Sequence, residues 1–175
     1  MGKMGFNKEK TKERYPASHN LSNFRDAETI GRVQTILASH CRVMPRLDYI
    51  DKWPNIDGTL TIQDEFHNLL GSIETQVKTL KNGSRRIRCG IKFVNYCCLD
   101  SMKPVILLGV DNSKNLIYWE ILNKDTIDKF QVDKDGKKAS FVFSESNIID
   151  NDHTDYIEKW TAHLHNYLEE ANKHF

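Results

Sequence analysis

Residues 104–110 form an unbroken apolar run of strand length, Pro104-Val105-Ile106-Leu107-Leu108-Gly109-Val110. A strand that is apolar at every position, and not only at every second one, has both of its faces covered. Residues 116–121 have the composition of another strand, and the short Asn/Ser/Lys connection makes them the partner of the first. The chain therefore needs covering layers on both sides of a sheet, which restricts it to layered folds.

Other segments predict the remaining layers. Residues 23–39 carry apolar side chains at helical spacing, and so do residues 155–175. Residues 56–62 and 72–79 are strand-like and separated by a short loop, which predicts an antiparallel pair. Residues 140–143 form a weaker strand, and residues 91–99 are compatible with either helix or strand. This order of elements predicts an α/β fold.

The length of 175 residues suits a single domain, expected over residues 21–175. Residues 1–20 are rich in lysine and poor in apolar groups, which predicts a flexible basic arm. With 25 basic and 24 acidic residues the net charge is only +1. Any affinity for nucleic acid must therefore come from a local basic patch.

The four cysteines, at positions 41, 89, 97 and 98, follow neither a disulfide framework nor the spacing of a zinc knuckle. This pattern is typical of a reducing compartment. No apolar run approaches the ~18 residues that a membrane-spanning helix needs. We therefore expect a cytoplasmic protein without a membrane partner.

A polar group on two neighbouring strands is the main candidate for chemistry. Side chains alternate along a strand, so Glu74, Gln76 and Lys78 are expected on one side of residues 72–79. Asp57, on the preceding strand, would approach the amide oxygen of Gln76 and the backbone carbonyl of Val77, and such oxygen ligands suit Mg²⁺. Lys78 would then lie near a bound phosphate and orient or deprotonate an attacking water. Together these residues predict a phosphodiester-cutting metal site.

Three further positions extend this site. Glu28, on the first helix, could complete the outer shell of the metal, and Gly58 leaves room for the close approach of a phosphate backbone. Basic residues directly after the strand would contact phosphates: Lys81, Arg85, Arg86 and Arg88.

Each of these features also has an ordinary structural interpretation. A solvated antiparallel strand carries Glu, Gln and Lys at alternate positions too, and an Asp-Gly pair is common in turns. Glu28 could be a solvent-facing helix charge, and the basic segment a solvated loop.

The larger pattern is more specific than any of its parts. It consists of Glu28-x-x-Gly31, Ile56-Asp57-Gly58, Gln76-Val77-Lys78, the run 104–110 and Ile117-Tyr118-Trp119. Over roughly residues 24–122 the chain resembles the DUF4365 group of the PD-(D/E)xK nuclease superfamily. It is similar, more distantly, to Mrr-type restriction endonucleases, which also use Gln-x-Lys.

The resemblance implies a restriction-endonuclease-like core, with a mixed central β-sheet flanked by α-helices. It implies hydrolysis of double-stranded DNA with Mg²⁺, or Mn²⁺ in its place, and with low sequence specificity. Carried over by position, Asp57 is a metal ligand, Gln76 the second ligand position, Lys78 the catalytic lysine and Glu28 the helix acid. The neutral Gln76 gives the metal less negative charge than a second carboxylate would, and Glu74 could supply the missing one.

The resemblance also implies partners. Domains of this group are often N-terminal effectors of larger bacterial proteins, in several cases anti-phage defence or restriction systems with a fused or associated NTPase or sensor module. A homodimer or higher oligomer is the expected active form. The alternative hypothesis is a catalytically inactive nuclease fold that binds nucleic acid or serves in assembly.

Overall fold

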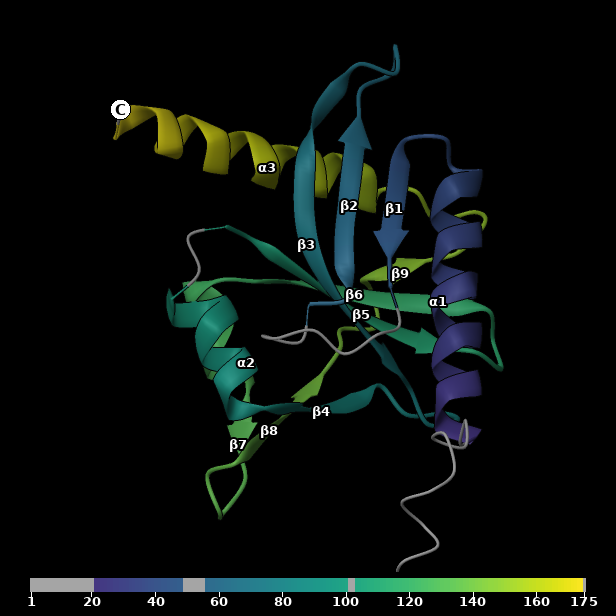
Figure 1. The fold of residues 1–175 in the computed structure, drawn as a ribbon, viewed down its shortest axis with the longest axis vertical. Coiled ribbons are helices and arrows are strands. Elements are labelled where there is room, and N and C mark those ends of the chain that lie inside the picture. The colour runs from purple at the N-terminus through teal and green to yellow at the C-terminus, as the bar shows by residue number, and fades with distance from the viewer. Residues whose placement is uncertain (1–20, 49–55, 101–102, 175) are drawn as a thin grey trace, which may run out of the picture.

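The computed structural model describes residues 21–48, 56–100 and 103–174. They form an α/β structure in which a curled, mixed sheet is flanked by helices and by a second, smaller sheet (Figure 1). The arm predicted over residues 1–20 lies outside the described residues.

The main sheet has six strands in the order β1-β2-β3-β5-β6-β9. Only the central pair, β3 and β5, is parallel, and a parallel pair requires a long crossover connection. This crossover contains a further strand, a short helix and one π-helical turn. The bounds of the sheet strands are Val43–Leu47 for β1, Gly58–Gln63 for β2, Leu69–Thr79 for β3, Val105–Asp111 for β5, Leu116–Leu122 for β6 and Ile148–Ile149 for β9.

The apolar strand β5 is buried at every position, as predicted. Ile106, Leu108 and Val110 pack into one hydrophobic cluster with α1 (Leu21–Ser39) and α3 (Tyr156–Lys173). Val105 and Leu107 point the other way, into a second cluster. The main sheet therefore has a hydrophobic core on each face, which is the layered arrangement that the apolar run demands.

The second core lies under the crossover and the small sheet. That sheet has the order β4-β8-β7. Its strands are β4 (Arg86–Gly90), β7 (Gln131–Val132) and β8 (Lys138–Val142). The helical elements on this side are α2 (Ile91–Asn95), the π-helical turn (Tyr96–Asp100) and a 3₁₀ helix (Lys124–Lys129). Phe143, directly after β8, packs closely on the main sheet, since a Cβ added at Gly109 would lie 2.4 Å from a carbon of its ring.

The predicted helices are confirmed, with two differences in burial. Ile30, Val33 and Leu37 of α1 are buried, but Ala27 is exposed. In α3 the buried residues end at Leu164, and Leu168 is 38% exposed. The reason is that the C-terminal half of α3 extends beyond the sheet (Figure 1).

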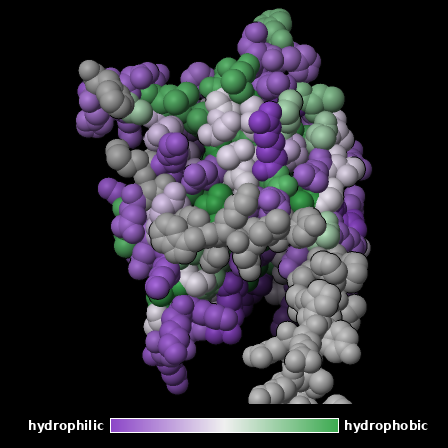
Figure 2. All heavy atoms as spheres, viewed as in Figure 1, coloured by the Kyte–Doolittle hydropathy of each residue, from purple (hydrophilic) through white to green (hydrophobic). Residues whose placement is uncertain are grey.

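Hydrophobic residues also reach the surface at the top of the molecule, where the β2–β3 hairpin projects (Figure 2). The large exposed ones there are Phe66 and Leu69. Among the described helices, none combines the length and the apolar character needed to cross a bilayer.

Candidate functional site

Asp57 is held against β3 by its backbone and by its side chain. Its N–H donates to the carbonyl of Thr75 at 2.9 Å. Its Oδ2 accepts the backbone N–H of Val77 at 2.6 Å. The carboxylate is therefore fixed beside the strand that carries Gln76 and Lys78, the neighbourhood that strand pairing predicts.

A pocket of 280 Å³ opens at this point between α1, β3 and Asp57, which directly precedes β2. Asp57, Gln76 and Lys78 all line it. The other lining residues are Asp26, Thr29, Ile30, Val77 and Thr79. The structure thus brings the three residues of the predicted motif to one pocket.

Gln76, one of the lining residues, has an unsatisfied polar atom. The side chain is only 5% exposed, and its Nε2 donates to the carbonyl of Val77 at 3.2 Å. Its Oε1 is buried and has no hydrogen-bond partner in the described part of the chain. A buried, unpaired acceptor costs about 1–3 kcal/mol, so a bound cation or water at this oxygen would relieve a real penalty.

Lys78 is half-buried, and its amine makes no ion pair with any of the residues described. Burial raises the pKa of the Cys89 thiol on β4 to about 11, and the positive charge of Lys78 opposes that rise. An ammonium group without a carboxylate partner is able to bind an anion that enters the pocket.

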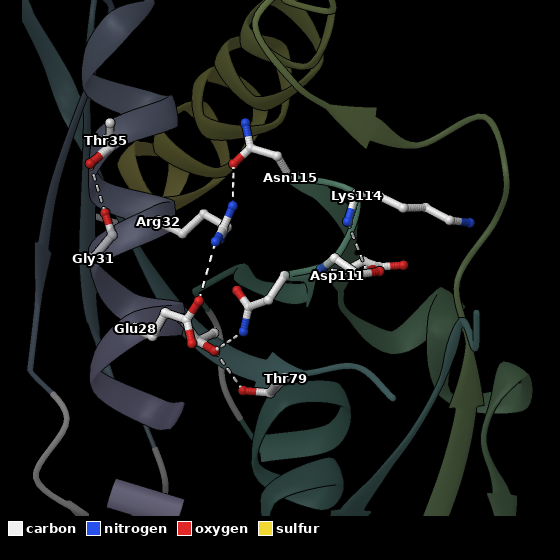
Figure 3. Close-up of polar contacts among 11 residues, drawn as sticks. Glu28, Gly31, Arg32, Thr35, Thr79, Asp111, Lys114 and Asn115 are labelled. Atoms are coloured by element: carbon white, nitrogen blue, oxygen red, sulfur yellow. Dashed lines mark hydrogen bonds and ion pairs between the residues drawn. The ribbon is translucent and has the colours of Figure 1, made fainter. Parts of the chain in front are cut away.

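The acid that α1 contributes to this pocket is Asp26, not Glu28. Glu28 lies at a neighbouring pocket, is 57% exposed, and pairs with Arg32 at 3.3 Å (Figure 3). Asp26 lines both pockets and forms no ion pair within the described ranges. Asp26 shares a helix face with Thr29 and Ile30, three and four positions later. That spacing is the signal in the sequence that points to Asp26.

The donor atoms of the pocket fit a hard cation. No group of three or more His, Cys, Asp and Glu side chains that could hold a metal occurs within residues 21–48, 56–100 and 103–174. The residues that line the pocket instead include Asp26, Asp57 and Gln76, whose amide oxygen has no partner among the described residues. Mg²⁺ is commonly bound by one or two carboxylates and keeps several of its waters. The residues present therefore suit Mg²⁺ better than a soft metal.

Gly58 has a packing role that differs from the predicted one. A Cβ at this position would lie 2.0 Å from the backbone oxygen of Arg46 on β1. Glycine is thus required for the close approach of β1 to β2, whether or not a phosphate comes near.

We expect Gly58→Ala to lower the free energy of unfolding by about 1–3 kcal/mol, because the added methyl forces β1 away. Urea denaturation measures the change. Gly31→Ala is the matched control, since nothing lies within 4 Å of its added Cβ. In the helix interior that substitution should stabilise by about 0.5–1 kcal/mol. Equal stability of Gly58→Ala and wild type would contradict this role.

Of the four basic residues predicted to contact phosphates, one borders the site. Lys81 lines the pocket next to the candidate site. Arg85 donates to the carbonyl of Phe143 and pairs with Glu145 at 2.9 Å.

The other two arginines lie on β4, so the predicted basic turn is a strand from Arg86 onward. Arg88 pairs with Asp133. Arg86 is exposed and forms no ion pair with the described residues.

No family model matches the chain, and no curated protein and no solved structure matches it either. The geometry of the pocket is therefore the basis on which we assign a function.

Proposed function

We propose that this chain is a Mg²⁺-dependent endodeoxyribonuclease of the PD-(D/E)xK type that hydrolyses double-stranded DNA. One observation carries the proposal: Asp57, Gln76 and Lys78 line one pocket. Gln76 also has a buried side-chain oxygen without a hydrogen-bond partner among the described residues. The resemblance of the same motif to these nucleases supports it. The oligomeric active form and the associated NTPase remain predictions.

Each residue has a role that its chemistry supports. Asp57 and Gln76 would hold the metal, with Asp26 as a further carboxylate. Bound Mg²⁺ would supply Lewis-acid stabilisation of the phosphate and a more acidic water. The N–H of Val77 keeps the Asp57 carboxylate in place. Lys78 would bind a phosphate oxygen, offset the charge that develops there and orient the attacking water.

A second candidate function is a nuclease fold that binds nucleic acid without cutting it. It is favoured by the neutral Gln76 and by the lack of a group of three acidic or other metal-binding side chains among the described residues. Such a module would bind DNA equally well in EDTA and in Mg²⁺ and would never nick it.

Nicking of supercoiled plasmid separates the two candidates. Lys78→Ala should slow nicking by about 10²-fold to 10³-fold, because it removes a cation that lines the pocket. Time courses with Mg²⁺, Mn²⁺ and EDTA measure the rate and its metal dependence. Lys138→Ala, on the exposed side of the small sheet, is the control. If wild type and Lys78→Ala are equally inactive with both metals, even when clustered by fusion, the enzyme proposal fails and the binding module replaces it.

A further inference from the structure

A second pocket, of 630 Å³, adjoins the candidate site. The two pockets share Asp26 and Thr79 in their walls. We propose that the second pocket binds the backbone phosphate next to the scissile one, with Arg25 and Lys81 as its cationic contacts. This inference rests on the proposed function and adds to it the path of the substrate strand.

The wall between the pockets is built by hydrogen bonds among three elements. The hydroxyl oxygens of Thr29 on α1 and Thr79 on β3 are 2.7 Å apart. Asn112, in the turn after β5, donates its Nδ2 to Thr29 Oγ1 at 2.9 Å. Figure 3 shows this chain of contacts beside the pair of Glu28 and Arg32. Because Asp26 and Thr79 line both pockets, a DNA strand that occupies the first pocket meets the second pocket next.

Two cations of the second pocket are available to an anion. Arg25 and Lys81 form no ion pair within the described ranges. Asp111 is only 3% exposed, and its Oδ1 accepts the N–H of Ser113 at 3.0 Å and the hydroxyl of the same residue at 2.6 Å. A third donor, the N–H of Lys114, lies at 3.2 Å.

The remaining carboxylates of the pocket are also accounted for. Glu28 pairs with Arg32, and Asp26 borders the candidate metal pocket. The charge of Glu28 is therefore offset by Arg32 with or without a metal, whereas the charge of Asp26 would be offset only by a bound divalent cation.

The arginines outside this pocket are poorer candidates. A phosphate at Arg85 would compete with Glu145, and a phosphate at Arg88 would compete with Asp133. Exchanging one anion for another gains little, so these residues add less to affinity than cations without partners. These two arginines therefore favour a strand path through the second pocket, and Arg86, which is exposed on β4, is the alternative contact that the experiment must separate.

Binding with Ca²⁺ in place of Mg²⁺ tests this path with a divalent cation available to Asp26. Fluorescence anisotropy of a short DNA duplex, over a range of salt concentrations and with EDTA as the metal-free comparison, gives the affinity and its salt slope. Lys81→Gln and Arg25→Gln should each weaken binding severalfold and reduce the salt slope by about 1, the effect of one lost phosphate contact. Lys138→Gln, which removes the same charge on the exposed side of the small sheet, should change neither quantity.

Several results would overturn the inference. They are a wild type that binds no DNA, wild-type binding by both pocket variants, or an equal loss for Lys138→Gln. A loss confined to Arg86→Gln would also overturn it and would assign the contact to β4. The plasmid assay separates failure of this inference from failure of the proposed function. If DNA binding depends on Lys81 and Arg25 but the protein never nicks plasmid, the inference is kept and the enzyme proposal is rejected. If the protein nicks plasmid and both variants bind DNA as wild type does, the enzyme proposal is kept and the inference is rejected.

Discussion

Asp57→Asn should lower the rate of plasmid nicking by about 10³-fold or more, since it removes the charge that would hold the metal and leaves the fold intact. Asparagine keeps an oxygen that can accept the N–H of Val77, the bond of 2.6 Å that positions the side chain. The substitution therefore tests the charge and not the packing. Initial nicking rates at saturating Mg²⁺ measure the effect.

A second readout does not depend on activity. Titration of the protein with Mn²⁺, followed by calorimetry, should show weaker binding in Asp57→Asn than in wild type. Asp128→Asn, an equivalent change at an exposed position of the 3₁₀ helix, should leave both rate and metal binding unchanged. Undiminished nicking by Asp57→Asn, together with wild-type Mn²⁺ affinity, would show that no metal is held at Asp57.

Trp160→Ala should lower the free energy of unfolding by about 3–5 kcal/mol, because it leaves a large cavity in the core. Trp160 has no exposed surface. Its ring meets Trp119 edge-on at 5.8 Å between centroids and Tyr156 at 4.6 Å. The contact with Trp119 joins α3 to β6, so its loss weakens the attachment of the C-terminal helix to the main sheet.

Thermal unfolding measures this effect, with an expected change of about 2–4 °C for each kcal/mol in a chain of this size. Leu168→Ala on the same helix is the matched control, because this side chain is 38% exposed and loses little burial. A melting temperature for Trp160→Ala equal to that of Leu168→Ala would contradict the packing role of α3.

The parts of the fold that sequence predicts well are those with a local signal. An apolar run at 104–110 must be covered on both faces, and every residue of β5 is buried. The hairpin of β5 and β6 follows from the short connection between them. Helices α1 and α3 follow from apolar spacing over many turns, which averages out single exceptions such as Ala27.

The strands that sequence analysis missed have weak or masked local signals. In β4, Ile87 and Cys89 face the core while Arg86 and Arg88 face outward, but this alternation spans only five residues and directly follows a basic segment, so it does not predict a strand by itself. Strand β1 lies at the edge of the main sheet and contains Pro45. Proline is tolerated in an edge strand, but its presence argues against a strand when the sequence alone is considered. The strands β7 and β9 span only two residues each. Pairing with distant segments, and not local preference, defines these elements.

For the candidate site, the sequence by itself determined that Asp57, Gln76 and Lys78 lie together, because side-chain alternation and the pairing of consecutive strands are local consequences of the chain. Only the tertiary structure decided that Asp26 rather than Glu28 faces the pocket, and which basic residues are available to a substrate. Arg85 meets Glu145 and Arg88 meets Asp133 across 60 and 45 residues of chain. Such ion pairs depend on how distant elements pack, and no local pattern encodes them.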